Sequence, residues 1–103
     1  MKLLWSPLAL ERATDIASYI ALDKPAAAEN WVLELFERVE RLPKHPRSGR
    51  KVPEIRIDRI REIMHGSYRV IYAIDDKAKL IEILTIRRGS EMLRKDEIDP
   101  ENT

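Results

Sequence analysis

The chain has no cysteine and only two histidines, His45 and His65, among its 103 residues. The absence of cysteine excludes disulfide bonds, thiol catalysis and cysteine-ligated zinc. With so few histidines, any metal site would depend on carboxylates, and no cluster of these side chains has the spacing of metal ligands. The sequence therefore predicts a protein without a metal site or another cofactor.

Long apolar runs are also missing. No stretch of about 20 apolar residues is present, so we expect no transmembrane helix. The opening segment 1–7 does not resemble a signal peptide, because its apolar part is short, Pro7 interrupts it and Glu11 follows soon after. We therefore expect a cytoplasmic protein that does not contact a membrane.

The chain does have enough apolar sequence for one folded domain. Hydrophobic residues make up 44% of it, and a domain typically needs about 100–150 residues. There are 19 basic and 18 acidic side chains, which give a formal net charge of +1. The total charge therefore does not indicate a nucleic-acid-binding protein.

Two amphipathic helices are predicted in the first half of the chain. Residues 2–5 favour a short strand, after which Ser6 suits a helix N-cap and Pro7 the first helical position. Apolar residues at spacings of three and four then predict one helix over about 7–22 and a second over 25–43. Because the break between them is short, they should form an antiparallel helical hairpin.

The second half is predicted to form strands. Segment 43–53 holds three prolines, a glycine and several basic residues, and it shows no helix or strand period, so we expect a loop. Segments 59–64, 68–74 and 80–87 are rich in β-branched and aromatic residues and are separated by turn residues. They predict three antiparallel strands in sequence.

These elements give an α+β fold with the order β-α-α-β-β-β, in which the helical hairpin packs on a small, mainly antiparallel sheet. We expect one domain over residues 1–90. The charged tail over 91–103 should be a short helix or disordered.

The predicted sheet has apolar side chains on both faces. In the last strand, Ile81 and Ile83 should point one way and Leu84 and Ile86 the other. One hairpin covers one face only, so the other face needs either the tail, through residues 92–93, or another protein chain. In the middle strand the two predicted faces are Val70, Tyr72 and Ile74 against Ile71 and Ala73.

Charge is unevenly distributed along the chain. Segment 38–61 carries nine basic and three acidic residues, whereas acidic residues collect on the two predicted helices. The basic half suits phosphates or an acidic protein segment, while a solvated surface is the simpler interpretation for most single side chains. Few aromatic residues are available for base stacking, and Tyr68 and Tyr72, which share a strand face, should belong to the core.

Arg69 differs from the other basic residues because it lies inside an apolar strand. Burying a guanidinium is costly unless it is paired. It should therefore either emerge on a partner-facing side of the sheet or pair with an acid such as Glu62 or Glu82. Arginine is well suited to hold a phosphate or carboxylate with two hydrogen bonds, so a functional and a structural role both remain open.

Five segments spread over residues 3–90 form a pattern in chain order. They are Trp5-Ser6-Pro7 with Ala9, Ile16 and Tyr19-Ile20; Pro25-Ala26-Ala27; Leu42 through His45-Pro46 with Gly49-Arg50; Arg61-Glu62-Ile63 with Ser67-Tyr68-Arg69-Val70-Ile71-Tyr72; and Ile83-Leu84 with Ile86-Arg87-Arg88. Together these segments resemble the RelE/ParE toxins of type II toxin–antitoxin, or plasmid stabilisation, systems.

The resemblance implies the α/β fold given above and an antitoxin chain, ParD-like or of another kind, that wraps the toxin in a hetero-oligomer. ParE-like members are thought to inhibit DNA gyrase. RelE-like members are ribosome-dependent mRNA endonucleases that use basic residues and a Tyr or His near the C-terminus. A third alternative is a family member that binds an antitoxin without being toxic.

Within the resemblance, Arg69 and Arg88 match the family's arginine positions. No Tyr or His follows Arg88, and the paired lysines of RelE-like enzymes correspond at best to Arg59 and Arg61. The chain therefore resembles the ParE branch more closely, and we do not expect enzyme activity. The residues expected to bind the target or antitoxin are Arg59, Arg61, Tyr68, Arg69, Arg87 and Arg88. The residues expected to act if the chain is a nuclease are Arg69, Arg88 and His65.

Overall fold

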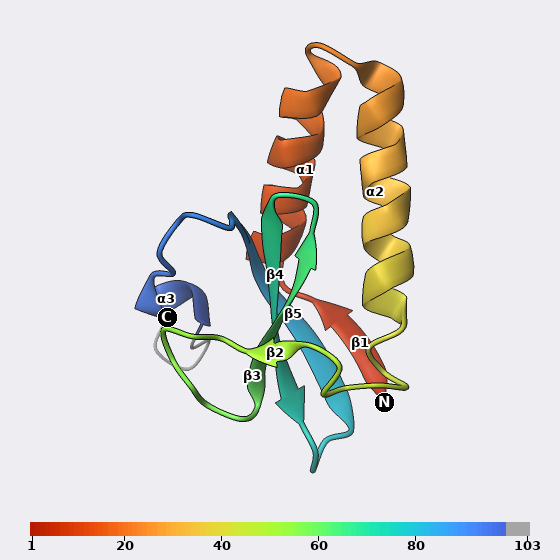
Figure 1. The fold of residues 1–103 in the computed structure, drawn as a ribbon. Helices are drawn as coiled ribbons and strands as arrows, with labels where there is room; N and C mark the ends of the chain where they lie inside the picture. The colour runs from red at the N-terminus through yellow and green to blue at the C-terminus, as the bar shows by residue number, and fades with distance from the viewer. Residues whose placement is uncertain (99–103) are drawn as a thin grey trace.

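The computed structural model describes residues 1–98, which form an α+β domain (Figure 1). Its elements are β1 (Lys2–Trp5), α1 (Pro7–Ala21), α2 (Pro25–Glu40), β2 (Arg50–Lys51), β3 (Ile60–His65), β4 (Tyr68–Asp75), β5 (Leu80–Arg88) and α3 (Lys95–Ile98). The expected fold class is confirmed, and β2 and α3 are added to the expected order. The end of the tail, 99–103, lies outside the described residues. Within residues 1–98, no helix has the length and apolar character needed to cross a membrane.

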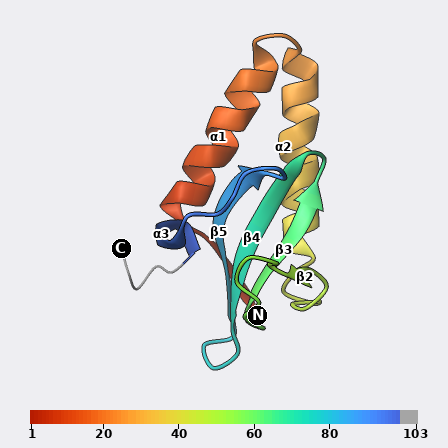
Figure 2. The ribbon, with the colours of Figure 1, turned by 60° about the vertical axis from the view of Figure 1, so that its left-hand side comes forward.

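The strands form one sheet with the order β1-β5-β4-β3-β2. β1 runs parallel to β5, and the other neighbouring strands are antiparallel. The α1–α2 hairpin packs on one face and extends well past the end of the sheet (Figures 1 and 2). The molecule is consequently elongated, with principal extents of 42 × 27 × 22 Å.

Both long helices begin where the sequence predicts. Ser6 Oγ accepts a hydrogen bond from the Ala9 amide at 3.0 Å, and Pro7 is the first residue of α1. Pro25 likewise begins α2. This helix ends at Glu40, before the predicted end at 43, and a turn continues the chain to Pro43, because a proline disfavours helical geometry in the residue before it.

The last strand contains a β-bulge that changes the predicted faces. Tyr72 pairs with Ile83 and Ile71 with Thr85, so Leu84 is an extra residue in β5. The bulge returns Ile86 to the helix-covered core that contains Ile81 and Ile83, while Leu84 lies in the core on the other face. The prediction that Ile86 shares a face with Leu84 was therefore wrong. The alternation predicted for β4 is confirmed.

The second face of the sheet is covered by the chain itself. Val52 and Ile55, from the loop before β3, pack there with Leu93 and Ile98 from the tail. Met92 is 73% exposed and takes no part. Another protein chain is thus not needed to bury this face, because the proline-containing loop supplies apolar residues that the sequence analysis did not count.

The short strand β2 was not predicted, and Gly49 shows how it is positioned. The Tyr72 hydroxyl donates to the Pro46 carbonyl at 2.7 Å and accepts from the Gly49 amide at 3.0 Å. A Cβ atom on Gly49 would lie 2.5 Å from the Glu62 carbonyl oxygen and 2.6 Å from the Tyr72 hydroxyl. Only glycine fits this approach to the sheet.

Candidate interaction site

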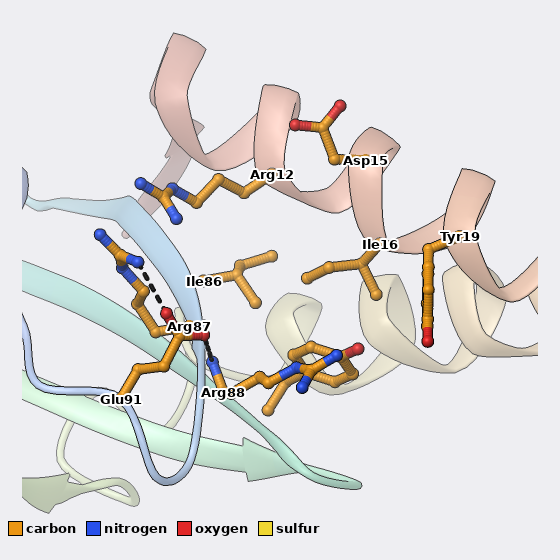
Figure 3. Close-up of a pocket in the computed structure, with 9 residues that line it drawn as sticks. Arg12, Asp15, Ile16, Tyr19, Ile86, Arg87, Arg88 and Glu91 are labelled. Atoms are coloured by element: carbon orange, nitrogen blue, oxygen red, sulfur yellow. Dashed lines mark hydrogen bonds and ion pairs between the residues drawn. The ribbon is translucent and has the colours of Figure 1, made fainter.

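A groove lies between the outer side of α1 and the end of β5 (Figure 3). It encloses a cavity of about 200 Å³. The residues that line it are Arg12, Asp15, Ile16, Tyr19, Tyr68, Ile86, Arg87, Arg88 and Glu91. Three arginines, two carboxylates and two tyrosines therefore meet beside apolar side chains, a composition suited to a charged peptide segment.

Arg12 and Arg87 are held on one side of the groove by carboxylates from the tail. Arg87 donates to Glu97 at 2.8 Å and to Glu91 at 2.9 Å, and Glu97 also bonds Arg12 at 2.6 Å. Glu97 is only 6% exposed. Its hydrogen bond is the main cause of the raised pKa of Arg87. Both arginines are therefore paired within the fold.

Arg88 is different, because its guanidinium forms no ion pair with any carboxylate of residues 1–98. Its side chain is exposed and extends along the groove toward Ile16 and Tyr19 of α1, whereas Arg87 turns toward Glu91 (Figure 3). Tyr19 is 63% exposed. Arg88 and Tyr19 are thus available to a partner without breaking contacts of the fold.

Arg69 lies outside the groove and is 4% exposed. It pairs with Glu62, one of the two acids expected, and not with Glu82. It also pairs with Glu54 from the loop before β3. All five guanidinium N–H groups have acceptors within the chain, the fifth being the Glu91 carbonyl.

This contact stabilises the ionised form of Glu54. The hydrogen bonds from Arg69 lower the pKa of Glu54 to about 2, and its carboxylate raises the pKa of Arg69 in turn. Glu54 also accepts a longer hydrogen bond, 3.4 Å, from the amide of Leu93 in the tail. Arg69 and Glu54 therefore fasten a loop and the tail to the second face of the sheet.

The remaining predicted residues are dispersed. Arg59 is exposed, and Arg61 pairs with Asp58 at 2.7 Å and donates to the Gly49 carbonyl at 2.9 Å. Both belong to the opposite part of the sheet, at and before the start of β3. Of the six residues expected to bind a target or antitoxin, the structure brings Tyr68, Arg87 and Arg88 together in the groove.

The residues expected for a nuclease do not meet in an open site. Strand register places His65 and Arg88 on either side of Tyr68. His65 is 3% exposed, its Nε2 lies 3.0 Å from the Trp31 carbonyl oxygen, and its ring packs 5.4 Å from that of Trp31. This covered imidazole is closed to a substrate, and Arg69 is fully paired.

Sequence reasoning missed the part of the groove that α1 contributes. Arg12, Asp15 and Tyr19 are separated by three and four residues, which places them on one helix face. That spacing was a usable signal. The tail residues Glu91 and Glu97 carried no comparable signal, because they belong to a charged segment without periodicity.

The family model of the ParE toxin of type II toxin–antitoxin systems, parDE, matches residues 3–93. The chain therefore belongs to the ParE toxin family. No curated protein matches the sequence significantly.

Two solved structures show the same fold. A structure described as a chromosomal ParDE toxin–antitoxin system from P. aeruginosa matches with a TM-score of 0.71 at 22% identity, over 85% of this chain and 95% of that one. The RelBE2 toxin–antitoxin complex from Mycobacterium tuberculosis matches with a TM-score of 0.55 at 20% identity, over 84% and 95%. The expected family and fold are thus confirmed, and within the family the chain is a ParE-type protein.

Proposed function

We propose that this ParE-family chain is the toxin subunit of a ParDE-type module, that it inhibits DNA gyrase in the cytoplasm, and that a cognate antitoxin neutralises it. The observation that carries the proposal is the match to the ParE toxin model over residues 3–93. The two similar structures are described as a toxin–antitoxin system and a toxin–antitoxin complex, which supports an antitoxin partner for this chain.

The groove argues against mRNA cleavage, the alternative to gyrase inhibition. An RNA endonuclease needs a general acid or base within reach of the reacting phosphate. Arg88 is open to a phosphate, but the nearest histidine, His65, is covered by Trp31. Segment 89–103 contains neither Tyr nor His. A RelE-like reaction therefore lacks its usual proton-transfer residue at this end of the sheet.

The groove also supports the antitoxin partner. Arg88 offers a cation without an ion pair among residues 1–98 and lies beside Ile16 and Tyr19, so a partner segment with a carboxylate next to apolar residues would fit it. We expect a small acidic protein encoded beside this gene to supply that segment. Coexpression of the two chains should give a stable complex.

Two assays with the purified chain test the target. In a gyrase supercoiling assay, the chain should inhibit supercoiling, and an equimolar amount of antitoxin should restore it. In a primer-extension assay with translating ribosomes, no new mRNA ends should appear. New cuts at the ribosome together with unaffected gyrase would contradict the proposal and favour the nuclease. Absence of both effects would favour a non-toxic antitoxin-binding protein.

A further inference from the structure

Three segments meet at the end of the molecule farthest from the α1–α2 turn: the loop 41–49, the segment 51–59 and the β4–β5 turn at 76–79 (Figures 1 and 2). Arg47 joins them, because its guanidinium bonds Asp58 and Asp76 at 3.0 Å each. Arg61 of β3 bonds the same Asp58 at 2.7 Å. These ion pairs connect the loops into one surface, called here the basic end.

The carboxylates of the basic end are already engaged by arginines of the fold. Asp58 and Asp76 bind Arg47, and Glu54 binds Arg69. Several cations are left over, all exposed and without an ion pair to any carboxylate of residues 1–98. Among them are Lys44, Lys51, Arg56, Arg59, Lys77 and Lys79.

Charge is consequently separated along the long axis of the molecule. Segment 41–61 has eight basic and two acidic residues, a net charge of +6, whereas the helices and their turn, 7–40, have three basic and seven acidic residues, a net charge of −4. The longest extent of the molecule is 42 Å. Such a charge distribution orients the chain in the field of a polyanion, with the basic end forward.

We propose that the basic end binds the phosphate backbone of a nucleic acid duplex. Exposed lysines and arginines that are not neutralised by neighbouring acids are the side chains that displace counterions from a duplex. A single strand is disfavoured, because the three segments contain no Phe, Tyr or Trp on which a base could stack. This inference does not depend on gyrase being the target.

An acidic protein segment is the alternative occupant, and the surface composition argues against it. A protein interface is usually anchored by large apolar or aromatic side chains in its centre. Among the three segments, Ile57 is the one exposed large hydrophobic residue, at 45%. The α1–β5 groove, with Tyr19 and Ile16, is the better protein site, so the two surfaces have different partners.

Binding of the purified chain to a fluorescent duplex DNA of about 20 base pairs, followed by anisotropy, tests the proposal. If the chain contacts about six phosphates, its affinity for the duplex should fall about a thousandfold when the salt concentration is raised from about 50 to about 200 mM. A duplex RNA of the same length forms a second arm. Equal binding identifies the backbone phosphates in general as the ligand, and stronger binding of DNA identifies the DNA duplex; both outcomes support the proposal.

Matched triple variants locate the surface. The variant K51Q/R56Q/R59Q removes three cations of the basic end, and K24Q/R94Q/K95Q removes three exposed cations elsewhere, so both lower the net charge equally. We expect the affinity of the first variant for the duplex to fall at least about tenfold, and that of the control to fall less than about threefold. The slope of log affinity against log salt concentration should become shallower by about 2.7 in the first variant, since three phosphate contacts are lost. Unchanged melting curves establish that both variants are folded.

Three results would overturn the inference. One is the absence of measurable duplex binding at low salt. Another is an equal loss of duplex affinity in the two variants, because an effect of total charge alone would weaken both to the same extent. The third is full competition by an acidic peptide of the same charge as the duplex, which would assign the surface to a protein partner. Gyrase inhibition is measured separately, so failure here leaves the proposed function standing.

Discussion

Arg69 and Glu62 form a buried ion pair in which Nε and Nη2 of the arginine donate to one carboxylate oxygen, at 2.8 and 2.6 Å. The other oxygen of Glu62 accepts from Arg50 at 2.7 Å. Glu62 is 1% exposed and Arg69 4%. Each buried charge is therefore compensated mainly by the other, and the loss of either leaves its partner with one remaining ion pair, Glu62 with Arg50 or Arg69 with Glu54.

Replacing this arginine tests whether it belongs to the fold. We expect Arg69→Ala to lose about 3–5 kcal/mol of unfolding free energy, because Glu62 and Glu54 lose their main partner. At roughly 4–8 °C per kcal/mol for a domain of this length, the melting temperature should fall by more than about ten degrees. The matched control is Arg59→Ala, an exposed site with no ion pair in the part of the chain that the structure describes, which should change stability by less than about 0.5 kcal/mol. An unchanged melting temperature with lost partner binding would instead assign Arg69 to the interface, as the sequence analysis allowed.

Acid should weaken the fold through Glu54. Arg69 lowers the pKa of Glu54 to about 2, below its unfolded value of about 4.3. A group with a lowered folded pKa stabilises the fold above its unfolded pKa, and that contribution is lost as pH falls through the folded value. Denaturant unfolding should therefore show the stability difference between wild type and Glu54→Gln narrowing from pH 5 to pH 2. A difference that stays constant with pH would contradict this assignment.

Gly49 should not tolerate a side chain. Gly49→Ala places Cβ against the Glu62 carbonyl and the Tyr72 hydroxyl, so we expect a loss of about 1–3 kcal/mol or more. Gly89→Ala is the matched control, because its nearest atoms would be 3.4 Å away, on the Met64 side chain and the Ser67 carbonyl. Chemical denaturation of the two variants should separate them clearly; equal stability would mean that the loop before β2 moves freely.

Arg88 should affect binding and leave stability alone. Its guanidinium is unpaired within residues 1–98, so Arg88→Ala should melt within about 2 °C of wild type. The affinity for the antitoxin should fall at least about tenfold, because a charged contact in the groove is lost. Calorimetric titration of the antitoxin measures this change. Lys95→Ala, which removes an exposed tail cation, serves as the control and should bind normally.

Much of the fold could be predicted from the sequence because local signals agreed. Ser6 followed by proline marked the start of α1, and apolar spacing gave both helices and three strands. The predicted alternation of β4 side chains between the two sheet faces was also confirmed. This strand pairs regularly with β3, and its pairing with β5 is interrupted only at the bulge. These features depend on neighbouring residues, which a sequence displays directly.

The remainder depended on contacts between distant segments. The bulge at Leu84 is a property of the pairing between β4 and β5, and nothing local to β5 marks it. The partner of Arg69 on its own sheet, Glu62, was among the acids named, but Glu54 comes from an aperiodic loop whose path the sequence does not reveal. The groove likewise depends on the tail returning to α1, through Glu97.

The parallel pairing of β1 with β5 has a consequence for synthesis on the ribosome. Lys2 pairs with Leu80 and Trp5 with Ile83, so β1 finds its place only after β5 has been made. The Ser6 hydroxyl also donates to the Leu84 carbonyl at 2.8 Å, which ties the cap of α1 to the same late segment. A nascent chain shorter than about 80 residues therefore exposes an unpaired N-terminal strand and an incomplete core, and no truncated product can assemble the groove. Formation of the sheet edge and of the groove is therefore delayed until β5 and the segment after it have been made.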